Sequence, residues 1–378
     1  MMRKQLIWVC TVFITLALTL TACGLPEMTP PSTTNPPPIV TDTQIVVIPA
    51  ITITVEPTEP LVTVPIKANN AGSLKITQQA AVRNVQGIAW SPDSLTLALT
   101  TQNNDLNNDQ VYGVTLLKAS DLSTFSVYSS TGNRVTSVAA DGKTAAVISK
   151  EMTAFSLVDT SDNAGLPRAR VTDFLIGDVS FSPDLRFVAV TKAESWEVVL
   201  YDFNTLNEVR ILTGFETAAP VFDAKFDNSP QWMVWHARGT LQLQEIELGM
   251  LSYPLMHEDF VYSYSLSPDG TLLASASAST IDNNLVPVIK LWDTSSSTEL
   301  RTLVLSEPVN TMKFSPDGKF LAVAVGNNLQ IWDAISGNLL ATHEGHTDAI
   351  QQLAFSPDQH SIVSTGSDNM LYLWQIPQ

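Results

Sequence analysis

One pattern of four short β-prone segments recurs along this chain, and it is clearest in residues 309–344. There the leading segment runs into the turn Ser315-Pro316-Asp317-Gly318, an apolar segment follows, and two further segments end at Trp332-Asp333 and Ala341. Turn residues separate antiparallel strands in this way. A four-stranded sheet this thin cannot bury both of its faces, so it needs copies of itself beside it.

Seven copies can be counted along the chain. Aligned on the serine turn, each copy begins with a β-branched residue, and successive copies are 40 to 50 residues apart. The mean of about 44 residues is the period of four-stranded propeller blades. The leading residues are Val85, Val135, Ile176, Val221, Val261, Val309 and Ile350. The second copy shortens the turn to Asp141-Gly142, and the fourth degrades it to Asn228-Ser229-Pro230.

The endings of the third segments carry a family resemblance. Two copies close with Trp292-Asp293 and Trp332-Asp333, and Gly345-His346 stands before the last copy. With the serine turns and the period, these residues resemble a WD-repeat β-propeller over roughly residues 72–378. The resemblance implies an all-β, seven-bladed fold. It also implies a non-catalytic, monomeric platform for protein partners, without a cofactor, whose top face binds the partner.

The last blade needs an additional strand. After Ile350 there is room for three strands, the third of which ends at Trp374. The segment Leu74-Lys75-Ile76-Thr77 lies 11 residues before Val85, nearly the spacing that other outer strands keep from the next leading residue. We therefore expect this N-terminal segment to complete the last blade, which pairs the two ends of the chain and removes an exposed sheet edge.

The first 23 residues predict a membrane anchor. Arg3 and Lys4 precede an uncharged run of 15 residues, Leu6 to Leu20. At about 1.5 Å per residue the run is shorter than the ~30 Å bilayer core, which favours a signal peptide over a transmembrane helix. Leu20-Thr21-Ala22-Cys23 resembles a bacterial lipobox, which implies lipidation of Cys23 and an extracytoplasmic protein held at the cell membrane. An ordinary secreted leader is the alternative.

A proline-rich segment follows the lipobox. Ten of the 22 prolines lie between residues 24 and 65, and proline at that density favours extended chain over helix or interior strand. The expected organisation is a lipoprotein signal peptide at 1–22, a lipidated cysteine with a Pro/Thr-rich tether at 23–71 and a propeller at 72–378. The alternating run Ile51–Val55 leaves an added edge strand open as an alternative.

Charge and cysteine content exclude several functions. Asp and Glu number 37 against 20 Lys and Arg, for a net charge of −17. Such a chain repels phosphate backbones, so nucleic acid is not an expected partner. The only cysteines are Cys10 and Cys23. The predicted mature domain therefore has no thiol for a disulfide, a thiolate metal site or a cysteine nucleophile.

The resemblance assigns a structural hydrogen-bonded tetrad to the last blade. Its members are His346, Asp368, Ser364 (or Thr365) and Trp374. A Ser-His-Asp hydrolase is the alternative interpretation, but the chain has no Gly-x-Ser-x-Gly elbow. His257 and Trp292 are expected to repeat the tetrad in blade five.

Two insertions lie between second and third strands, at residues 102–109 in blade one and 281–285 in blade five. Alternating oxygen side chains in the first resemble a calcium loop. These weak candidate ligands are Asp105, Asn107 and Asp109. Gln110 stands where such a loop needs glycine, and Leu116 where it needs glutamate, so a polar surface hairpin is the preferred interpretation.

Small or polar residues stand two positions after each leading residue, as expected around a narrow hydrated channel. They are Gly87, Ser137, Asp178, Asp223, Ser263, Thr311 and Gln352. Asp178 and Asp223 come from neighbouring blades at one level. They are interpreted as channel lining, with a cation site or a pair of catalytic carboxylates as the alternative. The second alternative makes the chain a propeller-type hydrolase or lactonase.

Overall fold

The computed structural model describes residues 63–377 apart from 105–108, 162–166, 194, 196, 215–222 and 238. The described residues all belong to one unit of the chain, Ile45–Gln378, which is distinct from the unit Met1–Gln44. The predicted signal peptide, Cys23 and the strand alternative at Ile51–Val55 lie outside the described residues. In the part that is described, no helix combines the length and apolar content needed to span a bilayer.

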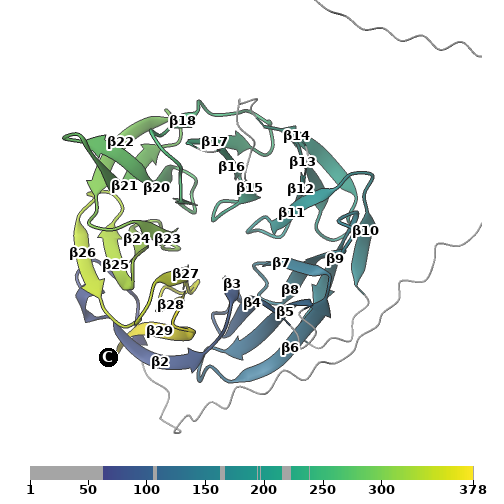
Figure 1. Cartoon of the computed structure of the whole chain (residues 1–378), viewed down its shortest axis with the longest axis horizontal. Helices are drawn as coiled ribbons and strands as arrows, with labels where there is room; N and C mark the ends of the chain where they lie inside the picture. The colour runs from purple at the N-terminus through teal and green to yellow at the C-terminus, as the bar shows by residue number, and fades with distance from the viewer. Residues whose placement is uncertain are drawn as a thin grey trace, which may run out of the picture. The chain divides into compact units, whose positions relative to one another are not determined.

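Seven antiparallel sheets stand around a central channel, and the predicted seven-bladed, all-β propeller is confirmed (Figure 1). Each sheet keeps its strands in order from the channel to the rim. Blades one to three comprise β3 (Val85–Trp90), β4 (Thr96–Asn104), β5 (Gln110–Lys118) and β6 (Thr124–Thr131); β7 (Arg134–Val138), β8 (Thr144–Ile148), β9 (Ala154–Asp159) and β10 (Arg168–Val171); and β11 (Ile176–Phe181), β12 (Phe187–Lys192), β13 (Glu197–Asp202) and β14 (Glu208–Thr213).

Blades four to seven repeat the arrangement. They comprise β15 (Asp223–Phe226), β16 (Trp232–Ala237), β17 (Thr240–Glu245) and β18 (Leu255–Met256); β19 (Ser263–Leu266), β20 (Leu272–Ile281), β21 (Asn284–Asp293) and β22 (Thr298–Val304); β23 (Val309–Phe314), β24 (Phe320–Val325), β25 (Asn328–Asp333) and β26 (Leu339–His343); and β27 (Ile350–Phe355), β28 (Ser361–Gly366) and β29 (Met370–Pro377). Val261 is buried but precedes its strand, and Val221 lies outside the described residues.

The serine turns are held by one repeated set of hydrogen bonds. In blade one the Ser91 hydroxyl donates to Asp93 Oδ1 at 2.5 Å and accepts from the Thr96 backbone N–H at 2.9 Å. That hydrogen bond also lowers the pKa of the Asp93 carboxyl. The same serine-to-aspartate bond recurs at 2.6 to 2.7 Å in blades five, six and seven, from Ser267, Ser315 and Ser356. The Ser-x-Asp spacing thus fixes the hairpin between the first and second strands.

Most of the core lies between neighbouring blades. Strand β24 is buried at all six of its positions, because its two faces pack against blades five and seven. Its Leu321 and Val323 contact the cluster of blade five, while Phe320 and Ala322 join that of blade seven. The requirement for neighbouring copies follows directly from this two-sided burial.

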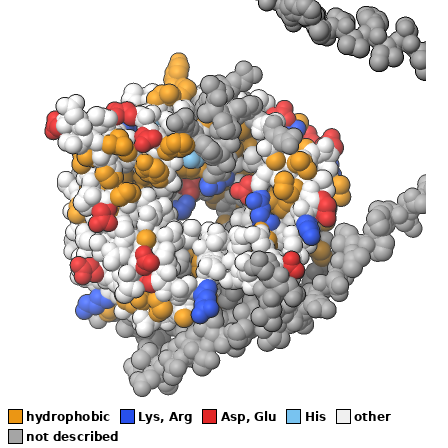
Figure 2. Space-filling model, in the orientation of Figure 1, with side chains coloured by type: hydrophobic (Ala, Val, Ile, Leu, Met, Phe, Trp, Pro, Cys, Tyr) orange, Lys and Arg blue, Asp and Glu red, His pale blue; other side chains and the backbone are white. Residues whose placement is uncertain are grey.

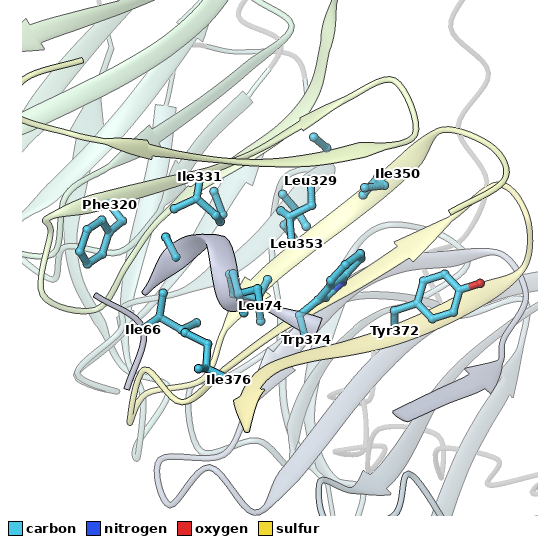
Figure 3. Packing of buried hydrophobic residues seen from close by; sticks show 14 residues of the cluster. Ile66, Leu74, Phe320, Leu329, Ile331, Ile350, Leu353, Tyr372, Trp374 and Ile376 are labelled. Carbon is cyan, nitrogen blue, oxygen red and sulfur yellow. The ribbon is translucent and has the colours of Figure 1, made fainter. Parts of the chain in front are cut away.

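An N-terminal strand closes the ring, as predicted. Strand β2 (Lys75–Ala81) pairs antiparallel with β29 and forms the outer strand of blade seven. Packed structure begins before residue 71, the expected end of the tether. Strand β1 (Thr63–Val64) also pairs with β29, and a 3-10 turn, η1 (Ala71–Ser73), follows it. Ile66, 1% exposed, and Leu74, 4% exposed, enter the core between blades six and seven (Figure 3). We call residues 63–81 the clasp.

Candidate functional site

The structure brings the four predicted tetrad residues of blade seven together. Trp374 Nε1 donates to Ser364 Oγ at 2.8 Å, and Ser364 Oγ lies 2.7 Å from His346 Nε2. His346 Nδ1 lies 2.9 Å from Asp368 Oδ2. Because the carboxylate only accepts, Nδ1 carries the proton and Nε2 accepts from the serine hydroxyl. Thr365, the alternative to Ser364, has no partner for its buried hydroxyl among the described residues.

Two glycines make room for this chain of hydrogen bonds. A Cβ on Gly345 would lie 2.7 Å from the Trp374 ring, and one on Gly366 would lie 2.6 Å from His346 Nδ1. Real Cβ atoms do not approach other atoms so closely. Glycine is therefore required before His346 because the Trp374 ring leaves no room for a side chain there.

Burial separates this arrangement from a hydrolytic triad with the same residue types. Ser364 has 0% exposure and His346 has 3%. A catalytic serine has to reach its substrate and keep its hydroxyl available, whereas Ser364 is enclosed and receives the indole hydrogen bond of Trp374. The geometry therefore supports a structural role that ties loop, turn and strand together.

Blade five keeps three of the four groups. Trp292 Nε1 donates to Ser275 Oγ at 2.8 Å, and His257 Nε2 lies 2.7 Å from the same oxygen. His257 Nδ1 is buried and has no hydrogen-bond partner among the described residues. The expected repeat of the tetrad is therefore incomplete. Burial, with a smaller contribution from nearby Lys290, lowers the pKa of His257 to about 4.

The two insertions lie in long hairpins. In blade five, β20 and β21 have ten residues each, and their turn places Asp282 and Asn283 at φ 51° and 64°. Asp and Asn tolerate this left-handed conformation, as two-residue hairpins require. In blade one, Asp105 and Asn107 of the predicted calcium loop lie outside the described residues, and Asp109 is exposed. No cluster of three potential acidic, histidine or cysteine ligands occurs where residues are described.

The channel aspartates are only partly located. Asp178 lies in β11 with its side chain half-buried, directly after a shift in the β11–β12 register. Asp223 begins β15, but its side chain is not among the described ones. The same register shift follows the leading residue in blades one, two, six and seven. The pairing of Asp178 with Asp223 stays a prediction.

A different charged group, not predicted from the sequence, lies at the channel. Asp227 of blade four, with a side chain 4% exposed, forms an ion pair with Lys313 of blade six, whose Nζ lies 2.5 Å away. Blade five, which lies between these two blades, donates two hydrogen bonds to Asp227 Oδ2. One comes from Ser265 Oγ at 3.0 Å and the other from the Leu266 N–H at 2.7 Å. The network links three blades. The sequence signal for this network is the degraded turn Asn228-Ser229-Pro230, which Asp227 directly precedes.

The face opposite the serine turns, which we call the top face, carries a polar hollow of about 310 Å³ between blades one and seven. The uncharged residues at its wall combine amides and hydroxyls. They are Asn84, Gln86, Gln351, Gln352, Thr365, Ser367 and Asn369, with Val82, Val85 and Gly366. Gln351 Nε2 donates to Ser367 Oγ at 3.1 Å, which joins the start of β27 to the β28–β29 turn on this face.

Comparison with known proteins identifies the repeats. The family described as WD domain, G-beta repeat matches residues 252–285, 297–333 and 337–375. The chain carries WD40 repeats. Each match begins near the outer strand of one blade and runs into the next blade, so the repeats join adjacent blades.

The related sequences support the same assignment over part of the chain. A WD repeat-containing protein of Synechocystis is 32% identical over 31% of this chain and 32% of its own length. The nuclear distribution protein PAC1 of Arthroderma benhamiae is 33% identical over 36% and 31%. The small ribosomal subunit protein RACK1 of Schizosaccharomyces pombe is 28% identical over 32% and 39%. The alignments span about a third of these WD40 relatives.

Proposed function

We propose that this chain is a lipid-anchored, extracytoplasmic WD40 propeller that binds protein partners on its top face without catalysis. The observation that carries the proposal is the polar hollow at that face, lined by uncharged amides and hydroxyls. Uncharged groups of this kind exchange hydrogen bonds with a polypeptide backbone. The enclosed Ser364, 0% exposed, supports a structural role for the residues that resemble a catalytic set.

Site-specific photo-cross-linking tests the face. A photoreactive residue at Ser367, exposed beside the hollow, is expected to cross-link a protein partner in the native membrane. The same residue at Leu95, 66% exposed in a serine turn on the opposite face, is the matched control. Cross-links formed only from Leu95, or none from Ser367, would contradict the proposal.

The anchor has its own test. Cys23→Ser is expected to abolish acyl labelling and to move the protein out of the detergent phase, because the sulfur atom is the acceptor of the lipid. Cys10→Ser, in the apolar run of the leader, removes a cysteine without touching the lipobox and should leave labelling intact. Absence of an acyl label on the wild-type protein would refute the lipoprotein assignment.

The second candidate function is hydrolysis of an ester, lactone or glycoside in the channel, with Asp178 and Asp223 as acid and base. Their positions at the starts of neighbouring inner strands favour it. Hydrolysis by the wild type that is lost in the Asp178→Asn/Asp223→Asn double variant, while cross-linking from Ser367 is absent, would select this function over the platform.

A further inference from the structure

The hollow of the top face has no charged group in its wall, which limits the ligands that it can take. None of its ten described lining residues is Asp, Glu, Lys, Arg or His. The area between β3 and β27, beside the central opening, is mainly white in the space-filling view, the colour of uncharged polar side chains and backbone (Figure 2). A charged ligand group would give up its water there without meeting an opposite charge, and an apolar group would leave the amides of the wall unpaired.

Three amide side chains of the wall turn acceptors toward a ligand, because their NH₂ groups are already used within the protein. Asn84 Nδ2 donates to Asn103 Oδ1 at 3.0 Å, and Gln86 Nε2 donates to the Asn84 carbonyl at 3.3 Å. Gln351 Nε2 donates to Ser367 Oγ at 3.1 Å. Each amide keeps its side-chain oxygen as an acceptor. The wall is therefore rich in uncharged acceptors.

Two further carboxamides have both of their groups available. The side chains of half-buried Gln352 and exposed Asn369 line the hollow, and neither makes a hydrogen bond to another described residue. Each has an NH₂ donor and a carbonyl acceptor. With the oxygens of Asn84, Gln86 and Gln351, the wall has five amide oxygens and two NH₂ groups for a ligand.

Backbone bulges place two of these glutamines at the hollow. The register of β3 and of β27 shifts at the second residue of the strand, so Gln86 and Gln351 are the extra residues of the ladder. A β-bulge redirects the side chain of its extra residue and is common beside binding sites. The equivalent bulge residues in blades two, three and six are Thr136, Gly177 and Asn310. Glutamine at the bulge thus distinguishes the two blades that border the hollow.

A primary carboxamide matches this set of groups. It has two N–H donors for the surplus of oxygens, and its own oxygen can accept from an NH₂ group of the wall. A hydroxyl has a single donor. A carboxylate has none, and it would face the amide oxygens. A sugar ring has apolar C–H faces that aromatic side chains cover, and no aromatic residue lines the hollow among the residues described.

We propose that the hollow binds the carboxamide side chain of a glutamine or asparagine on the protein partner. Its volume of about 310 Å³ is at the lower end of the range for ligand sites, roughly 300–1,000 Å³, which suits one side chain on a peptide segment. This inference rests on the proposed function, because it names the group of the partner that the top face would recognise.

Capped tripeptides that differ in one side chain provide the test, in ligand-observed NMR titrations of the full chain in detergent. The probe is acetyl-Ala-Gln-Ala N-methylamide, whose caps carry no primary carboxamide, and it is expected to bind saturably. The peptide with methionine at the centre has nearly the same shape and should bind about tenfold more weakly, the loss expected for two neutral hydrogen bonds. The peptides with glutamate and with lysine should also bind more weakly, because the wall has no opposite charge.

Two variants of the wall remove one carboxamide each and keep the backbone. Gln352→Met preserves the length of the side chain, and Asn369→Gly preserves the left-handed turn, where φ is 61°. Each should weaken the glutamine peptide about fivefold to tenfold and leave the methionine peptide unchanged. The matched controls should change neither peptide. They are Gln231→Met, exposed in the β15–β16 turn of the opposite face, and Asn283→Gly, at φ 64° in blade five.

Several results would overturn the proposal. They are absence of saturable binding by the glutamine peptide, equal binding of the glutamine and methionine peptides, tighter binding of the glutamate or lysine peptide, and wild-type affinity in both Gln352→Met and Asn369→Gly. Saturable binding of maltotriose, a neutral sugar, in place of the glutamine peptide would assign the hollow to a glycan and would overturn it as well.

Photo-cross-linking from Ser367 distinguishes this proposal from the function on which it rests. Cross-linking of a partner while the glutamine and methionine peptides bind equally would keep the protein-binding face and refute the carboxamide. Selective binding of the glutamine peptide without any cross-link from Ser367 would support the carboxamide site and refute the platform. If both proposals hold, the cross-link yield falls in Gln352→Met and stays at the wild-type level in Gln231→Met.

Discussion

Deletion of residues 24–83 is expected to lower the melting temperature severely or to prevent folding, because it removes the whole clasp. Strand β29 then loses its partner β2 along most of its length and exposes backbone groups at an edge that invites aggregation. Ile66 and Leu74, both nearly fully buried, leave the core between blades six and seven. At about 1.5–3 kcal/mol for each side chain, their loss alone approaches the net stability of a domain, about 5–15 kcal/mol.

Matched truncations separate the clasp from the segment before it. Deletion of residues 24–62 leaves every described clasp contact in place and should keep the wild-type melting temperature. Deletion of 24–73 keeps β2 but removes Ile66 and β1, and should give an intermediate value. Thermal melts of the three proteins at one concentration make the comparison. Equal melting temperatures for the shortest and longest deletions would show that the ring does not depend on the clasp.

The repeat made the fold predictable, since each blade carries its own turn chemistry. The Ser-x-Asp spacing specifies hairpins locally, and the spacing of Leu74 from Val85 located the closing strand within a residue of its observed start at Lys75. The two-residue strand β1 and the buried Ile66 were not found, because a segment this short has no periodicity. Their burial depends on Phe320 and Ile376, which are distant in sequence.

The candidate site was less predictable than the fold. The tetrad of blade seven follows from signature residues within one repeat, so its members could be named. The ion pair of Asp227 with Lys313 joins residues 86 positions apart across an intervening blade. Nothing local in either sequence segment specifies this pairing, and only the closed ring brings the two side chains together.

Blade five shows why a signature can be incomplete. In blade seven, Asp368 stands in the turn of a hairpin whose strand β28 has six residues, within reach of His346. In blade five, β20 has ten residues, which moves the corresponding turn about 13 Å further along the strand. An aspartate there cannot reach His257. The insertion that was visible in the sequence thus removes the fourth member of the tetrad.

The missing carboxylate predicts a particular pH dependence of stability. The pKa of His257 is lowered from 6.5 to about 4 in the folded chain. Between these values the unfolded chain binds a proton at this residue and the folded chain does not, so stability rises with pH. The contribution is fully present above about pH 6.5 and is lost as the pH falls to about 4. Its full size is about 3 kcal/mol, from 1.36 kcal/mol for each pH unit.

Urea denaturation of the wild type and of His257→Gln at pH 7 and pH 4.5 measures this contribution. The glutamine cannot titrate, so the variant should lose less stability on acidification than the wild type. Aspartates such as Asp293, whose pKa is lowered to about 2, change stability only at a pH below this range of 4.5 to 7. Other histidines and the neighbouring Lys290–Glu299 pair, 2.9 Å apart, are common to both proteins, so the difference isolates residue 257.

His346→Gln is the matched control in blade seven. Burial lowers the pKa of His346 as well, but its bond to Asp368 offsets part of that effect. The variant should therefore change the pH dependence less than His257→Gln does. It should still cost stability at pH 7, because it removes the ring N–H donor and leaves the Asp368 carboxylate with only the backbone N–H groups of Thr347 and Met370. Parallel pH profiles for the wild type and His257→Gln would show that His257 is not held neutral, and that its buried Nδ1 has a partner in solution.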